Sequence, residues 1–198
     1  MIILGVDPGS RFTGYGVVEV DGSATTVIEY GVFALDGRGD HHLKLREIYD
    51  SVTDVIERCK PDECAIEMPI YGKNAQSMLK LGRAQAAAIL AALNRDIPVM
   101  QYTPKEVKKS VTGNGAASKE QVWYMVRSLL AIRDSDETMG LDASDALAVV
   151  LCHSHRNDRV PSTKGRGGWE AFVRDNPGRV VSRERGSRGI EEDRKIGR

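Results

Sequence analysis

The sequence has few cysteines, few aromatic residues and no long apolar run. Its three cysteines, Cys59, Cys64 and Cys152, form neither an even set nor a tight ligand spacing. They therefore support neither a disulfide framework nor a structural zinc site. No stretch approaches the roughly 20 apolar residues that cross a bilayer, and the N-terminus lacks the basic start and apolar core of a signal peptide. We expect a cytoplasmic protein that does not bind membranes.

The formal net charge at pH 7 is zero, but the charged residues are unevenly distributed along the chain. Residues 1–155 contain 16 Lys and Arg against 21 Asp and Glu, whereas residues 156–198 contain 12 against 7. A chain of 198 residues suits one domain with a tail. We predict a domain over 1–156 and a basic, Gly- and Arg-rich, disordered tail over 157–198.

The tail has two interpretations. It either gathers a polyanion through counterion release or is a solvated segment with no partner. Trp169, Phe172 and Val173 are its apolar exception. They are either a short docking segment or incidental.

Apolar spacing predicts strands that alternate irregularly with amphipathic helices. Asp21-Gly22 suits a tight hairpin, and Ser118 suits a helix N-cap. The expected strands cover 2–6, 15–20, 25–33, 63–67 and 98–102, and the expected helices cover 42–59, 75–94, 104–112, 119–130 and 141–155. This order predicts an α/β fold in which a mixed five-stranded sheet has helices on its faces.

Four acidic residues stand at the ends of these elements. Asp7 and Glu67 each follow an apolar strand, and a helix lies between the two strands. A right-handed parallel crossover would bring both carboxylates to one edge of the sheet. Asp142 and Asp145 are three residues apart and share one face of the last helix. Helix capping is an alternative explanation for Asp142, but Asp145 lies one turn further in, beside apolar positions.

The chemistry of this set points to a metal. No Lys or Arg lies on the last helix before Arg156, so we expect the carboxylates to meet without a cation and to repel one another. Metal ions would neutralise them, and hard oxygen ligands suit Mg²⁺ or Mn²⁺. Two such ions about 3.5 to 4 Å apart hydrolyse phosphodiesters: one generates hydroxide from water and the other stabilises the leaving oxygen.

Three segments together resemble the RuvC family of Holliday-junction resolvases. They are GVDPGSRFTGYGVV at 5–18, AIEMPIYGKNAQSMLKLGRAQAA at 65–87 and LDASDALAVVLCHSH at 141–155. The resemblance covers residues 1–156 and implies a ribonuclease H-like fold. It also implies a homodimer with two Mg²⁺ ions per active site, Mn²⁺ being possible. Such an enzyme makes paired symmetric nicks in four-way DNA junctions, leaving 5′-phosphate and 3′-hydroxyl ends, in recombination and repair.

The same resemblance assigns roles to residues and names partners. Asp7, Glu67, Asp142 and Asp145 match the family's catalytic metal-binding acids. The branch-migration proteins RuvA and RuvB become expected partners, and the nucleoid the expected location.

Further positions match the DNA contacts of the family less closely. Lys108 and Lys119 match basic positions near DNA and flank the flexible segment VTGNGAAS. Lys73 and Asn74 lie in the loop after Glu67, on the expected DNA side. The family often has Phe where this chain has Ile70, so the neighbouring Tyr71 is the alternative stacking residue.

Other readings stay open. The segment 5–18 also resembles the phosphate hairpin of actin-like and sugar-kinase ATP-binding domains, although a second Gly-rich segment is missing. A non-catalytic junction-binding module and a nuclease of the same fold acting on ribosomal RNA precursors are further alternatives. GNGAASK lacks the Gly-Lys-Ser order of a P-loop. Cys152, His153 and His155 point to different helix faces, so we expect structural or exposed roles for them.

Overall fold

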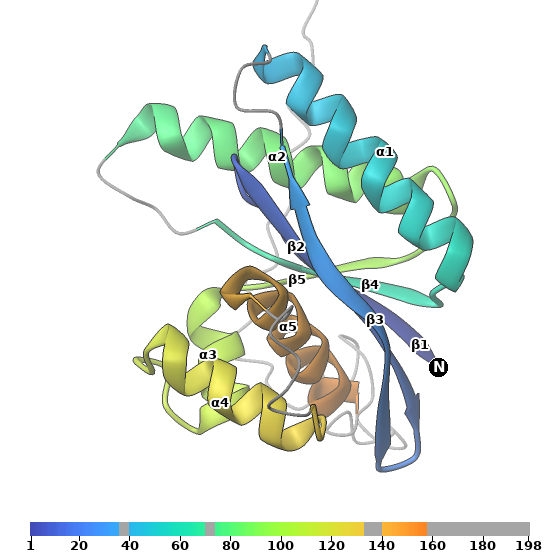
Figure 1. Cartoon of the computed structure of the whole chain (residues 1–198), viewed down its shortest axis with the longest axis vertical. Coiled ribbons are helices and arrows are strands. Elements are labelled where there is room, and N and C mark those ends of the chain that lie inside the picture. The colour runs from blue at the N-terminus through green and yellow to red at the C-terminus, as the bar shows by residue number, and fades with distance from the viewer. Residues whose placement is uncertain (36–39, 70–73, 133–139, 158–198) are drawn as a thin grey trace, which may run out of the picture. The chain divides into compact units, whose positions relative to one another are not determined.

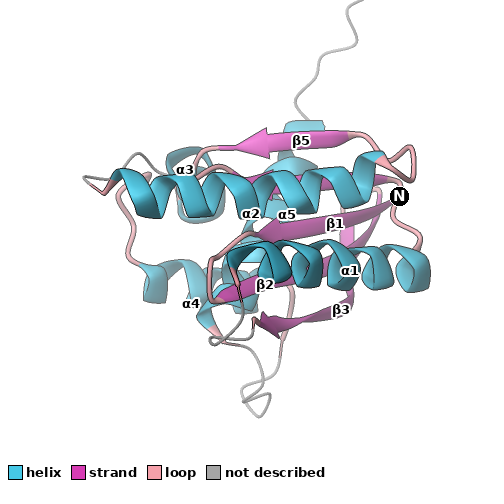
Figure 2. Cartoon of the chain, turned by 90° about the horizontal axis from the view of Figure 1, so that it is seen from above, coloured by secondary structure: helices cyan, strands magenta, loops and turns pink. Residues whose placement is uncertain are grey.

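A mixed five-stranded sheet with helices on both faces forms the core of the fold (Figures 1 and 2). The computed structural model describes residues 1–35, 40–69, 74–132 and 140–157. The strands are β1 (Ile2–Asp7), β2 (Phe12–Asp21), β3 (Ala24–Ala34), β4 (Glu63–Glu67) and β5 (Val99–Tyr102). Their order is β3-β2-β1-β4-β5; β2 runs antiparallel to β1 and β3, whereas β1, β4 and β5 are parallel. The predicted fold class and the parallel crossover are confirmed.

Two helical layers cover the sheet, as Figure 1 shows above and below it. One consists of α1 (His41–Cys59) and α2 (Ala75–Leu93), and the other of α3 (Pro104–Thr112), α4 (Lys119–Leu129) and α5 (Leu141–Asn157). Each layer closes its own apolar cluster against the sheet. No helix in the described ranges is long and apolar enough to span a membrane.

The alternation of side chains along each strand decides which helical layer the acidic side chains face. In β1, Leu4 and Val6 pack in the cluster under α1 and α2, whereas Ile3 packs in the cluster under α5. Because side chains alternate along a strand, Asp7 shares the α5 face with Ile3. In β4, Ala65 belongs to the α5 cluster, which places Glu67 on that face too.

β2 begins three residues before the predicted start. Phe12 pairs with Ala34 of β3, and Gly14 pairs with Asp7 of β1. The added start of the strand includes Gly14, which packs against the backbone of Asp142. The hairpin at Asp21 is as predicted: Asp21 pairs with Ala24, and Gly22 has a φ of +58°.

α5 lies directly on glycines of the two neighbouring strands. A Cβ atom at Gly5 would lie 2.3 Å from the carbonyl oxygen of Ala146, and one at Gly14 would lie 2.0 Å from that of Asp142. Such distances are far below van der Waals contact, so any larger residue would push the helix away. These glycines let the first turns of α5 approach the end of β1.

Candidate active site

Three carboxylates meet where β1 ends and α5 begins. Asp7 is the last residue of β1, and Asp142 and Asp145 lie in the first turns of α5. One oxygen atom from each lies within 4.8 Å of the others, and all three residues are partly buried. The prediction that the acids on one face of the last helix would meet Asp7 is confirmed in geometry. No fourth acid within the described ranges joins this close group.

Glu67 lies beside the three-acid cluster. Ile66 pairs with Val6 in the parallel β1–β4 ladder, so Glu67 and Asp7 follow at the same level of the sheet. Both line a pocket of about 160 Å³ together with Asp145. The remaining lining residues are Pro104, Val107, Lys108, Lys119 and Val122. Asp7 and Asp145 belong both to the three-acid cluster and to this pocket, so the four predicted acids lie around one site.

Burial disfavours the ionised forms of Asp7, Glu67 and Asp145. It raises the pKa of Asp7 to about 7, with added repulsion from Asp145 and Asp142 that Lys119 partly offsets. Burial, reinforced by Asp7 and Asp145, raises the pKa of Glu67 to about 8. The pKa of Asp145 is raised mainly by burial and is held down by its hydrogen bond from Lys119. A cluster of this kind favours either protons or cations.

The expectation that the acids meet without a cation was wrong. Lys119, at the first position of α4, donates a hydrogen bond from Nζ to Oδ2 of Asp145 at 2.6 Å. Burial opposes the charge of Lys119, but this hydrogen bond and the surrounding carboxylates raise its pKa. The expectation counted cations only along α5, and Lys119 belongs to a different helix.

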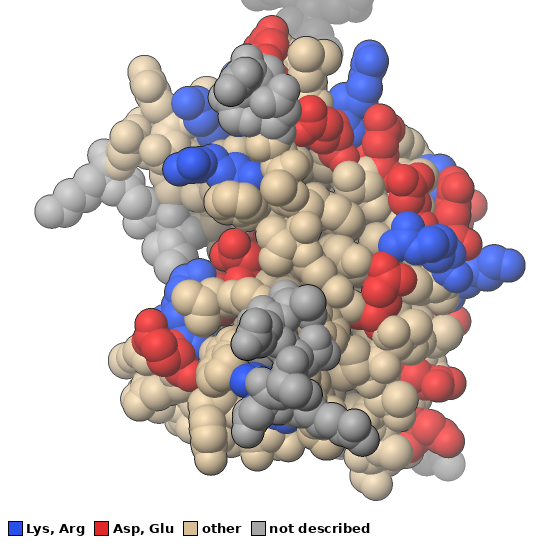
Figure 3. Space-filling model, viewed as in Figure 1, with Lys and Arg blue, Asp and Glu red and all other residues tan. Residues whose placement is uncertain are grey.

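The structure describes the other predicted DNA contacts only in part. Lys108 lines the acidic pocket from α3. Asn74 caps α2, because its Oδ1 accepts hydrogen bonds from the backbone N–H groups of Gln76 and Ser77. Ile70, Tyr71 and Lys73 lie outside the described residues, as do the predicted tail and its segment around Trp169. Figure 3 shows basic residues next to acidic ones on the left of this face.

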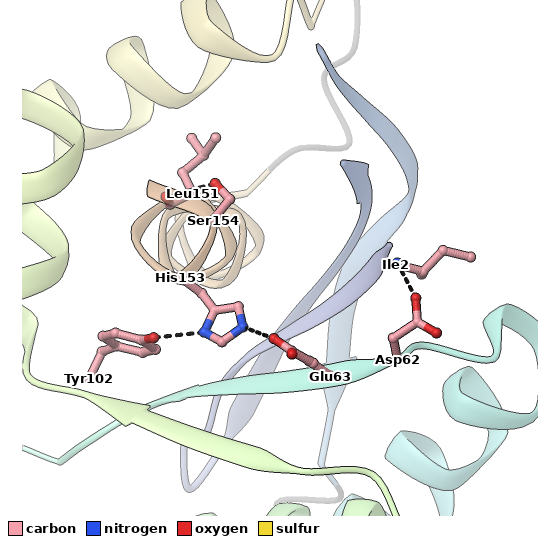
Figure 4. A network of polar contacts seen from close by, with 7 residues as sticks. All are labelled: Ile2, Asp62, Glu63, Tyr102, Leu151, His153 and Ser154. Carbon is pink, nitrogen blue, oxygen red and sulfur yellow. Dashed lines mark hydrogen bonds and ion pairs between the residues drawn. The ribbon is translucent and has the colours of Figure 1, made fainter. Parts of the chain in front are cut away.

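A buried histidine ties the far half of α5 to the sheet. His153 is hydrogen-bonded through Nδ1 to the hydroxyl of Tyr102 at 2.6 Å and through Nε2 to Glu63 (Figure 4). Nδ1 of His155 instead meets the hydroxyl of Ser110 at 3.1 Å. Structural roles for these histidines agree with the prediction, and the partners of His153 come from β4 and β5, which sequence spacing does not link to α5.

The donor set of the cluster fits a hard divalent cation. Its atoms are carboxylate oxygens without histidine or thiol ligands, and burial raises the pKa values of Asp7 and Asp145, so a bound cation would favour their charged forms. Asp7, Asp142 and Asp145 are close enough to hold one ion. Glu67 lines the same pocket as Asp7 and Asp145.

Comparison with known proteins decides the family. Residues 3–153 match the family described as crossover junction endodeoxyribonuclease RuvC. The chain belongs to the RuvC family. The crossover junction endodeoxyribonuclease RuvC of Salinibacter ruber is 56% identical over 180 residues, covering 91% of this chain and 99% of the relative. That of Bacteroides fragilis is 49% identical over 179 residues, covering 90% and 95%.

A solved structure agrees with the RuvC assignment. Thermus thermophilus RuvC in complex with a Holliday junction substrate superposes with a TM-score of 0.73 at 29% identity. The match covers 79% of this chain and 94% of that one. The ribonuclease H-like fold expected from the RuvC resemblance is therefore confirmed.

Proposed function

We propose that this protein resolves four-way DNA junctions by paired, Mg²⁺-dependent nicks in recombination and repair. The observation that carries the proposal is the meeting of Asp7, Asp142 and Asp145 at one edge of the sheet, in a chain of the RuvC family. Glu67 completes the catalytic set from the adjacent strand. The T. thermophilus relative, solved with a Holliday junction, supports the substrate.

The protein's own contribution is a rigid, poorly hydrated set of oxygen ligands. β1 is buried on both faces, which fixes the carboxylate of Asp7 in place. Mg²⁺ held there by Asp7, Asp142 and Asp145 would lower the pKa of water and stabilise charge on a leaving oxygen. We assign two ions to each site, held by Asp7, Glu67, Asp142 and Asp145, with Mn²⁺ as an alternative metal.

The two lysines of the pocket suit a DNA backbone. Lys108 and Lys119 come from α3 and α4 and line the same pocket as the acids. A phosphodiester entering the pocket meets their ammonium groups, which position it without reading its sequence. Contacts from Ile70, Tyr71, Lys73 and Asn74 belong to the same proposal. They would lie in the loop after β4 and at the start of α2.

The outer face of α2 suits a homodimer. Leu79, Leu90 and Leu93 are each at least half exposed, and a Cβ atom at Gly82 between them would meet no described atom beyond the backbone of α2 within 4 Å. These residues recur at helical spacing, so they form one apolar strip. Pairing two copies over this strip would give a twofold enzyme for a twofold junction. RuvA and RuvB are the proposed protein partners and the nucleoid is the proposed location, both from the family relationship.

A cleavage assay tests the proposal. The purified protein is incubated with a four-way junction, a linear duplex and a structured RNA, with and without Mg²⁺, and the nicks are mapped. We expect symmetric nicks in the junction alone, only with Mg²⁺, whose 5′-phosphate and 3′-hydroxyl ends a ligase seals. Asp145→Asn should keep junction binding and lower nicking by roughly 100-fold or more, because it removes a charged metal ligand.

Asp54→Asn, at an exposed position of α1, is the matched control and should cut like the wild type. Preferential cleavage of RNA would favour a nuclease of RNA precursors instead. Mg²⁺-dependent nicking by the Asp145→Asn protein at wild-type rate would contradict the assigned site. Saturable ATP binding without nicking would favour the actin-like alternative.

A further inference from the structure

Lys119 stands in an unusual place for a lysine. It is the first residue of α4, whose N-terminus is closed by a reciprocal capping box between Ser118 and Gln121. The N-terminus of a helix carries partial positive charge, so a cation there is unfavourable within the helix itself. Its position must therefore be stabilised from outside α4, and Asp145 of α5 supplies that partner at 2.6 Å.

This ion pair occupies an oxygen atom of the metal cluster. Asp145 is one of the three carboxylates that lie within 4.8 Å of one another. The Asp145 side chain is 15% exposed and that of Lys119 52% exposed, so the ammonium reaches in from solvent to a largely shielded acid. Lys108 lines the same pocket but forms no ion pair with any described residue.

The ammonium group of Lys119 and a divalent cation weaken each other's binding to this carboxylate cluster. Each neutralises the same carboxylates, and like charges at such short range repel strongly in a partly buried site. The lysine is on a long flexible stem with half of its surface in water, so it can leave Asp145 without moving α4. The pocket it would swing across is the one that faces DNA in the proposed function.

We propose that Lys119 is the resident cation of the metal-free site, and that it exchanges Asp145 for a DNA phosphate when a divalent cation is bound. The inference rests on the proposed function. Its consequence is a coupling between the two ligands: cation binding frees a phosphate-binding group. The same lysine keeps the acidic cluster together before the cation arrives.

The test measures cation binding in the absence of DNA. Mn²⁺ is titrated by calorimetry into the wild type and into Lys119→Met, Lys119→Arg and Lys108→Met. A partly exposed ion pair changes an equilibrium constant by a factor of about two to five. We expect Lys119→Met to bind Mn²⁺ tighter by that factor, Lys119→Arg to bind like the wild type, and Lys108→Met to change less than Lys119→Met. The metal-free melting temperature should fall in Lys119→Met and stay near the wild-type value in Lys119→Arg.

A second measurement follows junction affinity in EDTA and in Ca²⁺. The gain from Ca²⁺ should be smaller in Lys119→Met than in the wild type, because no ammonium is released. Mn²⁺ affinity unchanged in Lys119→Met, or raised equally in Lys108→Met, would overturn the inference. Weaker Mn²⁺ binding in Lys119→Met would also overturn it, showing that the lysine positions Asp145 for the ion. If the wild type nicks junctions in these cases, the proposed function still stands; a wild type that neither binds Mn²⁺ nor nicks would refute the proposed function itself.

Discussion

At the scale of a single residue, burial of the Asp7 carboxyl group in the active site lowers the stability of the metal-free protein near neutral pH. The pKa of this group rises from 3.8 in an exposed chain to about 7, mainly through burial. The folded state then holds a proton that the unfolded chain releases, so the free energy of unfolding falls as the pH rises through this range. Glu67 extends the same effect, with its pKa raised from 4.5 to about 8. The metal-free protein is therefore stabilised below pH 4 by these groups and loses that stabilisation towards pH 8.

Asp7→Asn should make the metal-free protein less sensitive to pH. We expect its melting temperature at pH 8 to exceed that of the wild type by several degrees, since about 1 kcal/mol shifts the melting temperature by about 2 to 4 °C for a domain of this size. Added Mg²⁺ should raise the melting temperature of the wild type at pH 8, and less so that of Asp7→Asn. Calorimetric scans from pH 5 to 8 with and without Mg²⁺ measure both effects. Asp54→Asn is the control, and an identical response in all three proteins would contradict the assignment.

At the scale of elements, the glycines under α5 decide where the acids meet. Gly5, Gly14 and Gly16 lie on neighbouring strands, with Gly5 paired to Gly16. The added Cβ of an alanine would meet helix backbone at Gly5 and Gly14 but the end of the Leu147 side chain at Gly16. The backbone contacts leave no room to adjust, so these two positions fix the height of α5 above the sheet.

Gly14→Ala should displace the first turn of α5 and separate Asp142 from Asp7. We expect the free energy of unfolding to fall by about 1 to 3 kcal/mol, which is typical of overpacking. Nicking should also fall at a temperature where the variant is still folded, so the loss of activity cannot come from unfolding alone. Chemical denaturation and the junction-nicking assay measure the two effects, and a Mn²⁺ titration measures whether the displaced helix weakens cation binding. Gly140→Ala adds the same methyl group beside the start of α5 but into open space, so its cation affinity should stay unchanged. Normal Mn²⁺ binding by Gly14→Ala would show that the glycine does not position the helix.

Local patterns predicted most of this arrangement. Apolar runs located every strand, and the cap residues Thr103, followed by Pro104, and Ser118 marked the starts of α3 and α4, where the structure shows capping boxes. The acids were found because each ends a strand or begins a helix. The contact of Lys119 with Asp145 was missed because it depends on how α4 lies against α5, and nothing within either helix encodes that placement. Gly14 lay outside the strand predicted over 15–20, and its packing role was missed because a close approach leaves no side-chain pattern to detect.

At the scale of the whole molecule, the apolar strip on α2 predicts the oligomeric state. Leu90 is 52% exposed near the middle of this strip. A glutamate there would place charge in the centre of the proposed interface, where burial without a partner is costly. The remaining fold should tolerate it, because Leu90 points away from the core.

We expect the wild type to be a dimer in analytical ultracentrifugation and Leu90→Glu to be a monomer with an unchanged circular dichroism spectrum. The monomer should lose paired cutting of the junction. Leu43→Glu, at a similarly exposed leucine of α1, is the control and should remain dimeric. A wild type that is monomeric at all concentrations, or a dimeric Leu90→Glu, would refute α2 as the interface.

The position of α5 has a consequence for the newly made chain. Its acids, Asp142 and Asp145, leave the ribosome after Asp7 and Glu67, because they come later in the chain. β1 and β4 can pair before synthesis reaches residue 141, but their edge then lacks two of its four acids. A nascent or prematurely ended chain therefore carries no assembled nuclease centre, and cutting begins only after the domain has been translated to the end of α5.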